Sequence, residues 1–316
     1  MEFFKTHTRI PFMKQRRWAA VFSVIIFVAS VIALCVNGLN FGLDFTGGTQ
    51  VEVSFKSPTT AEQVRASLAQ AGFRDTVVQA YNTTDYSIRF RLDALGAGST
   101  GADTSLSAHD EQQLRANLMQ ALPETTIGSL EYIGPEVGHN LMTNGVLAIV
   151  VALLGTMIYI AWRFDYRFAA SAAIALVHDP ILILGLFSFF HWEFNLIVLA
   201  AVLTVIGYSL NDTIVVYDRV RENFRKIKKS TPLEVMDLSI NQTLSRTIMT
   251  SGLTLSVVVI LFFFGGPTLQ PFSLALIIGI VIGTYSSIYV AGALAVAMGL
   301  NRAALIPVQK QTDGLP

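Results

Sequence analysis

Long apolar runs dominate this chain of 316 residues. Six of them approach or exceed the roughly 18 residues that a helix needs to cross the hydrocarbon core of a bilayer. They are Trp18–Val36, Leu141–Trp162, Phe168–Phe190, Phe194–Tyr217, Thr247–Phe264 and Phe272–Met298. Membrane barrels use shorter, alternating strands, so the pattern predicts an α-helical membrane bundle with six transmembrane helices. The first run follows five basic residues and lacks a small-residue cleavage site, so we expect it to remain as an anchor.

A different pattern fills the stretch between the first and second runs. Residues Thr49–Phe55 alternate apolar with polar side chains, which is typical of a half-buried strand. The other predicted elements are strands near 76–81, 86–92 and 126–133 and helices over 61–72 and 107–122. The order β-α-β-β-α-β predicts an α+β ferredoxin-like domain. A Gly/Ser/Thr-rich stretch, 96–105, is predicted to be a flexible loop.

Basic residues in the short links predict the orientation in the membrane. Five Lys or Arg precede the first run and six lie between Arg219 and Lys229, whereas the links 191–193 and 265–271 contain none. The positive-inside rule therefore places both termini in the cytoplasm and the ferredoxin-like domain outside it. The expected divisions are cytoplasmic termini at 1–17 and 301–316, a first transmembrane helix at 18–38, an extracytoplasmic (periplasmic) domain at 39–138, and helices two to six within 139–300 with a cytoplasmic loop at 218–245.

Composition excludes several classes of function. The chain is 52% hydrophobic, only 14% charged and formally neutral, which argues against a nucleic-acid partner. Cys35 is the only cysteine, so an intramolecular disulfide and a cysteine-based metal site are excluded. No nucleophile–base set, zinc spacing or glycine-rich phosphate loop is found. We therefore expect no enzymatic activity, no cofactor and no metal.

Ionisable residues within the apolar runs are the candidates for chemistry. His178 and Asp179 lie near the middle of the third run, and Asp212 lies about 10 Å inside the cytoplasmic end of the fourth. A charged group at such depth costs about 3 kcal/mol on insertion scales and normally faces a partner or a water-filled cavity. Asp212 is the stronger functional candidate, with a role in helix packing as the alternative. For His178 and Asp179, a proton relay and a paired unit that holds helices together both stay open.

Arg246 stands at the start of the fifth run. A basic residue there is often only a flank of the positive-inside kind, but an arginine side chain reaches several ångströms, so a contact with Asp212 is geometrically open. The sixth run carries a small residue at every fourth position, which is typical of a close-packed helix pair. These residues are Gly279, Gly283, Ser287 and Ala291.

The segment Phe41-Gly42-Leu-Asp44-Phe-Thr-Gly47-Gly48 joins the first run to the outside domain. Its glycines allow positive φ and a sharp change of direction, and Asp44 can accept hydrogen bonds from neighbouring backbone amides. From the residues alone, a tight turn at a membrane exit is sufficient to explain the segment.

Two motifs together carry a resemblance to a known family. FGLDFTGG directly after a first membrane span resembles the junction signature of the SecD/SecF export proteins, part of the RND superfamily. The segment Asn211–Asn223 resembles the SecF version of a second family motif. Its residues of interest are Asn211, Asp218, Arg219, Glu222 and Asn223. The resemblance extends over essentially the whole chain, with one span, an outside domain and then five spans.

The resemblance implies an RND-like half of a twelve-span unit in the bacterial inner membrane, with SecD expected as a separate chain. Such a pair uses the proton gradient to draw exported, unfolded polypeptide from the SecY channel after SecA has driven it in. YajC and membrane lipid are further expected partners, and protons are the coupling ion. Asp212 and Arg246 match family proton-path positions, and SecD is expected to pack against the small-residue face or one beside it. The alternatives are an RND-type small-solute exporter and a non-conducting structural scaffold of the translocase.

Overall fold

The computed structural model describes residues 8–73, 76–90, 108–227 and 229–300. It divides into two compact units. The bundle unit comprises Met1–Asn40, Ala148–Trp192 and Ile197–Pro316, and the smaller unit comprises Phe41–Leu147 and Glu193–Leu196. The predicted loop 96–105 lies outside the described residues.

The smaller unit has the predicted ferredoxin-like fold. Its elements are β1 (Asn40–Phe41), α2 (Leu43–Thr46), β2 (Gly48–Phe55), α3 (Ala61–Gln70), β3 (Val77–Ala80), β4 (Asp85–Phe90), α4 (Ala108–Ala121), β5 (Thr125–Ile133) and β6 (Glu193–Phe194). Four strands form an antiparallel sheet in the order β3-β4-β2-β5, and β1 pairs separately with β6. Alternate residues of β2, Val51 and Val53, are buried with Val64 and Leu68 of α3 and Leu118 of α4. The alternating sequence therefore gives one apolar sheet face, which the two helices cover.

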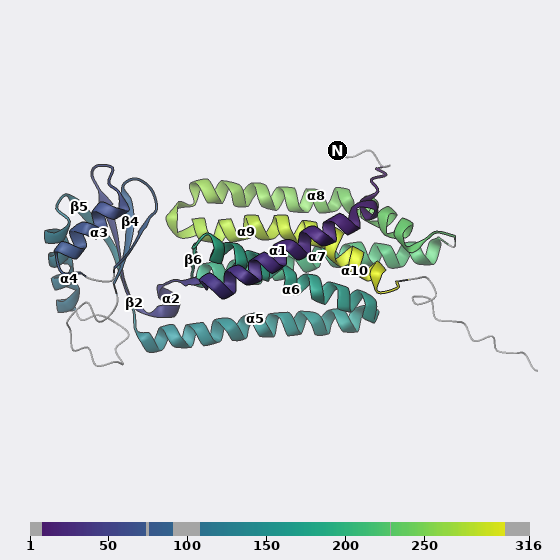
Figure 1. The fold of residues 1–316 in the computed structure, drawn as a ribbon, viewed down its shortest axis with the longest axis horizontal. Coiled ribbons are helices and arrows are strands. Elements are labelled where there is room, and N and C mark those ends of the chain that lie inside the picture. The colour runs from purple at the N-terminus through teal and green to yellow at the C-terminus, as the bar shows by residue number, and fades with distance from the viewer. Residues whose placement is uncertain (1–7, 74–75, 91–107, 228, 301–316) are drawn as a thin grey trace, which may run out of the picture. The chain divides into compact units, whose positions relative to one another are not determined.

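The bundle unit contains six helices long and apolar enough to cross a membrane, as predicted. The elements that build it are η1 (Phe12–Gln15), α1 (Arg16–Asn37), α5 (Pro135–Arg163), α6 (Tyr166–Phe189), α7 (Leu196–Lys226), α8 (Pro232–Phe264), α9 (Gly266–Ser286), the π-helical turn η3 (Ser287–Ala291) and α10 (Gly292–Ala297). The long helices run side by side in Figure 1. Three of them, α6, α7 and the span Thr268–Ala297 that contains α9, bury half or more of their most apolar window. Helix α5 buries only 11% of its own and so presents an apolar surface suited to lipid.

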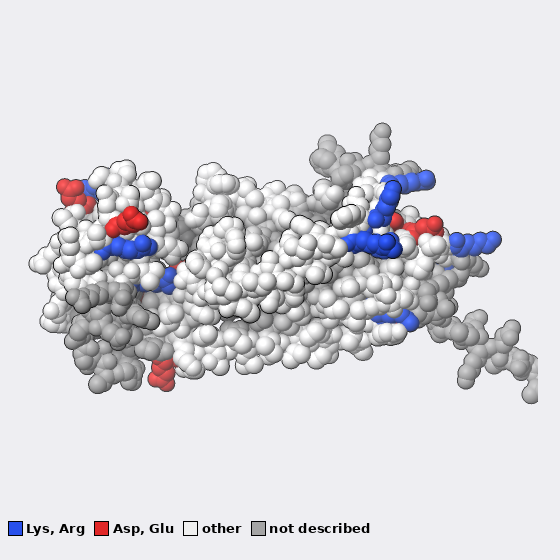
Figure 2. Space-filling view, viewed as in Figure 1, with Lys and Arg blue, Asp and Glu red and all other residues white. Residues whose placement is uncertain are grey.

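Charged side chains gather at one end of the bundle. Figure 2 shows Lys and Arg where α1 begins and where α7 and α8 meet, and a white flank of uncharged residues along the drawn face of the bundle. Trp18 and Trp162, both more than 80% exposed, lie at the same ends of their helices as this basic cluster. Tryptophan prefers the membrane–water interface, so these rings mark one boundary of the bilayer.

The stretch expected as a loop at 218–245 is mostly helical. Helix α7 continues to Lys226 and α8 already begins at Pro232, so only a short link separates them. Thr231 caps α8 by accepting a hydrogen bond from the Glu234 amide, and Glu234 accepts one in return from the Thr231 amide. A helix that projects beyond an apolar layer keeps its backbone hydrogen bonds but takes a polar surface, so the charge pattern did not indicate where the two helices end; the cytoplasmic position of the stretch stays a prediction.

The small-residue face of the sixth span packs against α7 within the chain, so it is not the surface for SecD. That SecD packs on a face beside it stays a prediction. A Cβ added at Gly279 would overlap the Val205 side chain of α7, and one added at Gly283 would lie 3.0 Å from the Ser209 Cβ. Ser287 and Ala291 are fully buried in η3. The Ala291 carbonyl accepts a hydrogen bond from the Tyr217 hydroxyl of α7 at 2.9 Å. Small residues therefore bring α9 and η3 close to α7.

A substitution at Gly279 tests this internal packing. We expect Gly279→Ala to lower the free energy of unfolding by about 1–3 kcal/mol, because the added methyl group overpacks the contact with Val205. Gly155→Ala is the matched control, since a Cβ there meets nothing within 4 Å. Denaturation of the purified protein in detergent measures both variants. Equal stability of the two would show that α9 and α7 separate easily.

Candidate functional site

Asp179 is the centre of a buried polar cluster in the bundle. Its side chain is 1% exposed and accepts hydrogen bonds from the Ser209 hydroxyl at 2.5 Å and the Ser286 hydroxyl at 2.7 Å. His178 Nδ1 lies 2.9 Å from its other oxygen. The carboxylate therefore connects α6, α7 and α9. Buried polar groups normally require such partners because unpaired ones are costly in an apolar medium.

The His178 ring has an aromatic neighbour as well as the Asp179 carboxylate. It stacks on Phe27 of α1 with ring centroids 5.9 Å apart and planes at 7°. Its Nε2 atom is buried and has no hydrogen-bond partner among the described residues. The prediction that His178 and Asp179 form a pair is consistent with this geometry, and both of their proposed roles stay predictions.

Asp212 lies apart from that pair, in a less constrained environment. Asp212 is 4% exposed. In the described chain its side chain accepts one hydrogen bond, from the Ser251 hydroxyl of α8, and the distance of 3.4 Å is long for such a bond. Ser251 also contacts the Thr284 hydroxyl of α9 at 3.0 Å. Ser209 shares a helix face with Asp212 but bonds to Asp179 instead. A buried ionisable group with so few partners inside a membrane bundle is a candidate functional site.

Arg246 is exposed on α8 and does not pair with Asp212 in this structure. Within the described residues, no acidic group lies within 4.0 Å of the Arg246 guanidinium. Arg246 lies about one turn of helix before Thr250 and Ser251. The Thr250 hydroxyl donates to the Arg246 carbonyl, whereas the Ser251 hydroxyl reaches Asp212. The two predicted proton-path residues thus belong to neighbouring helices without contacting each other.

The junction segment FGLDFTGG forms the short helix α2 and two sharp turns. Gly47 and Gly48 have φ values of 67° and 127°, in the region that glycine adopts readily, as predicted. The described residues include no hydrogen bond from the Asp44 side chain to its sequence neighbours; it accepts a 2.8 Å hydrogen bond from the Leu196 amide at the start of α7. The first turn of a helix has unpaired amides that favour an anion. The Asp44 carboxylate therefore stabilises the start of α7, although the two residues are 152 positions apart in sequence.

Arg89 and Glu193 complete the junction. Arg89 on β4 donates to the Phe41 carbonyl at 3.0 Å and lies 3.3 Å from a Glu193 carboxylate oxygen. A Cβ at Gly42 would come 2.7 Å from the other Glu193 oxygen, so this glycine leaves room for the ion pair. Burial raises the pKa of Glu193 above 4.5, partly opposed by the positive charge of Arg89 and reinforced by the Asp44 carboxylate.

Substitution at this ion pair should move the pKa of Glu193 in opposite directions. Arg89→Met removes the cation that lowers it, so we expect a still higher pKa; Asp44→Asn removes a like charge, so we expect a lower one. Because the folded-state pKa is raised, the contribution of Glu193 to stability is full below pH 4.5 and declines as pH rises through that pKa. NMR titration of a carbon-13-labelled Glu193 measures the shifts. Shifts of the same sign in both variants would contradict this account.

The second motif fixes the end of α7 that carries the basic cluster. Asn223 donates hydrogen bonds to the Ser239 hydroxyl at 2.8 Å and to Gln242 Oε1 at 2.9 Å on α8. Three other motif residues form partly exposed ion pairs, Asp218 with Arg163 and Arg219 with Glu222, and Asn211 is exposed. Besides the Asp212–Ser251 contact, the motif therefore contains a buried tether between α7 and α8 at Asn223 and a set of partly exposed pairs that contribute little to stability.

Comparison with known families agrees with both motifs. Residues 113–301 match the family described as protein export membrane protein SecD/SecF, C-terminal, and residues 32–59 match the SecD/SecF GG motif. The chain belongs to the SecD/SecF family. The GG motif covers the junction at Gly47 and Gly48, and the C-terminal family covers Asp179, Asp212 and Arg246.

Individual members of the SecD/SecF family are similar over nearly their full length. Protein translocase subunit SecF of Vibrio alginolyticus is 44% identical over 98% of this chain and 96% of its own. SecF of Escherichia coli O157:H7 is 41% identical over 96% and 92%, respectively. The crystal structure of SecDF from Thermus thermophilus, a translocon-associated membrane protein, has a TM-score of 0.83 at 34% identity. This chain covers 39% of that longer protein, and the match extends over 93% of this chain.

The hydroxyl partners of the two aspartates were not predicted from the sequence. Ser286 on α9, which bonds to Asp179, and Ser251 on α8, which bonds to Asp212, lie in apolar runs where several hydroxyls recur and none indicates its partner. A hydroxyl in a membrane helix usually bonds to the carbonyl four residues earlier. Whether a given hydroxyl reaches a carboxylate instead depends on how its helix is rotated about its own axis. The sequence pattern does not determine that rotation.

Proposed function

We propose that this chain is a SecF subunit of the protein translocase, which with SecD uses the proton motive force to promote translocation of polypeptides after SecA-driven insertion into SecY. The observation that carries the proposal is Asp212, a buried and weakly supported carboxylate inside the bundle of a SecD/SecF family member. Protons are the coupling ion, and no enzymatic chemistry or cofactor is involved.

A face of the bundle fits a SecD-type partner. Asn211 on α7 and Arg246 on α8 are exposed, and a Cβ at Gly207 or Gly252 would meet nothing within 4 Å. Exposed amide and guanidinium groups are unfavourable against lipid, whereas small residues beside them allow a second helix to approach. The part of the Thermus thermophilus SecDF chain outside the match is the natural source of such a helix. The SecY channel, YajC and the unfolded exported polypeptide are proposed partners on the family resemblance.

The proposed location is the bacterial inner membrane, with both termini cytoplasmic. Ser57 in the smaller unit and Ser230 beside the basic cluster are both exposed. In a Cys35→Ser background, we expect Ser57→Cys, but not Ser230→Cys, to react with a membrane-impermeant thiol reagent added to the periplasmic side. Permeabilised cells, in which both should react, provide the control. The reverse pattern would contradict the orientation.

Depletion of the protein in cells tests the function against its alternatives. We expect pulse-labelled secretory precursors to accumulate while the efflux of small solutes stays unchanged. Impaired efflux with normal export would favour a small-solute exporter. Export that is equally impaired with and without a proton gradient would favour a structural scaffold.

A further inference from the structure

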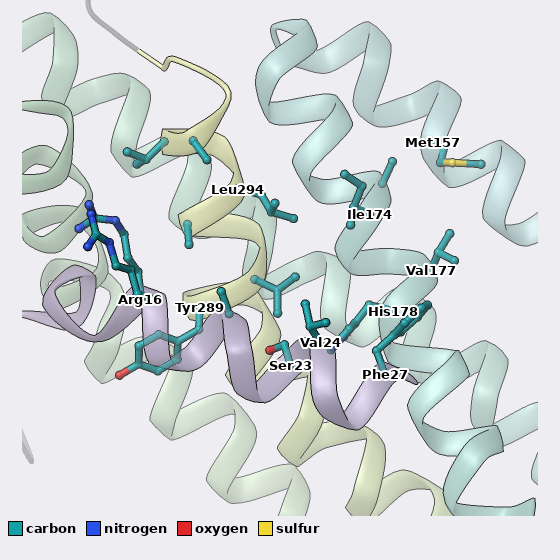
Figure 3. A pocket seen from close by; sticks show the side chains of 17 residues that line it. Arg16, Ser23, Val24, Phe27, Met157, Ile174, Val177, His178, Tyr289 and Leu294 are labelled. Atoms are coloured by element: carbon teal, nitrogen blue, oxygen red, sulfur yellow. The ribbon is translucent and has the colours of Figure 1, made fainter. Parts of the chain in front are cut away.

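An apolar groove runs along the bundle between α1, α6 and the η3–α10 segment, with α5 along its open side. Its volume is about 910 Å³, and Figure 3 shows its wall of aliphatic and aromatic side chains. Met157 reaches it from α5, which stands apart from the other walls in this view. The groove is thus open to the apolar phase that surrounds the bundle.

The two ends of the groove differ in chemistry. Arg16 and Arg17 lie at one end, where α1 begins, and Phe27 and His178 lie at the other. Arg16 donates one hydrogen bond to the Met13 carbonyl, and Arg17 is exposed. In the part of the chain that the structure describes, neither guanidinium lies within 4.0 Å of an acidic group. Two positive charges are therefore available at one end of an apolar channel.

The length of the groove matches one leaflet of the bilayer. Arg17 and Phe27 are ten residues apart on α1, or about 15 Å along the helix axis. The hydrocarbon core is about 30 Å thick, so the groove ends near the bilayer centre. Exposed Trp18, next to Arg17, places the arginine end at the interface. A transmembrane helix of a partner would need a groove of twice this length.

We propose that the groove binds one anionic phospholipid, with the phosphate at Arg16 and Arg17 and an acyl chain reaching the Phe27–His178 stack. The positive end attracts the phosphate, since basic residues at a membrane surface favour anionic lipids by roughly 1 kcal/mol each. The apolar walls accept the chain. Bound there, the chain end covers the groove side of His178, whose Nε2 has no partner in the described residues, and keeps water from it.

Lipid binding to the purified full-length protein tests the proposal. Native mass spectrometry of delipidated protein titrated with dioleoylphosphatidylglycerol or dioleoylphosphatidylcholine gives the affinity for one lipid per chain. We expect the parent to bind phosphatidylglycerol about tenfold more tightly than phosphatidylcholine. The double variant Arg16→Gln/Arg17→Gln should bind the two lipids equally. The control Arg225→Gln/Lys229→Gln removes two exposed charges away from the groove and should retain the preference.

A second pair of variants tests the acyl-chain site. Ala20 lines the groove and Ala29 does not, although both are exposed on α1. Ala20→Phe should weaken binding of both lipids about tenfold, whereas Ala29→Phe should bind as the parent does. Equal affinity of the parent for the two lipids, or unchanged binding by Ala20→Phe, would overturn the proposal. Because the readout is binding by the isolated protein, its failure is separate from a failure of the proposed export function.

Discussion

Asp212→Asn should abolish gradient-dependent stimulation of protein export while leaving the protein folded and assembled. Asparagine keeps the size of the side chain and an acceptor for the Ser251 hydroxyl, but it cannot bind or release a proton at this site. A proton crossing the membrane releases about 2.3 kcal/mol per 100 mV, and only a group that both binds it and changes its contacts can use that energy. Loss of the titratable group therefore removes the coupling.

The contact that changes is the one proposed with Arg246. In this structure Asp212 meets Ser251, and Arg246 is exposed on the adjacent helix. We propose that a second state brings the guanidinium to the carboxylate when it is ionised, and that the movement is transmitted to the smaller unit through Phe41–Gly48. Asp44 at the start of α7 supplies a direct hydrogen-bonded link from that segment to the helix carrying Asp212.

Export into proteoliposomes containing the translocase and SecD, with and without an imposed gradient, measures the effect. Asp218→Asn is the matched control, because Asp218 belongs to the same motif but forms a partly exposed pair with Arg163. It should stimulate export as the parent does. Full stimulation by Asp212→Asn under the same gradient would leave Asp212 as a packing residue and would contradict the mechanism.

Periodicity and apolar length predicted the elements well because each depends on short stretches of sequence. The alternation over Thr49–Phe55 gave β2 to within one residue, and apolar length gave all six membrane helices. Long-range contacts were not predicted. Asp44 was expected to bond locally but caps a helix 152 residues away, because the chain returns beside the junction through β6.

Helix rotation was the second property that the sequence left open. The repeat from Gly279 to Ala291 correctly indicated a close-packed face, yet nothing in it distinguishes a helix of the same chain from a helix of a partner. The structure places Val205 and Ser209 of α7 against it. For the same reason the hydrogen-bond donors of Asp179 were not predicted, because their hydroxyls come from two other helices.

Asp179→Ala should destabilise the bundle more than any change at Asp212. It leaves His178 Nδ1 and the hydroxyls of Ser209 and Ser286 without their common acceptor. Unpaired buried groups cost about 1–3 kcal/mol each, and interhelical hydrogen bonds in membranes are at the weaker end, so we expect a loss of about 2–5 kcal/mol. Asp179→Asn retains one acceptor oxygen and should lose less. Asp212→Asn, with a single 3.4 Å hydrogen bond to keep, should unfold as the parent does.

Circular dichroism monitors the unfolding of the three purified variants in detergent and ranks their stabilities. This order separates the two roles still open for the His178–Asp179 pair. A carboxylate that mainly joins α6, α7 and α9 is needed for folding, so its removal lowers stability and reduces export with or without a gradient. A carboxylate that mainly carries protons is needed only when the gradient acts. Parent-like stability of Asp179→Ala together with a selective loss of gradient-driven export would therefore assign Asp179 to the proton path beside Asp212.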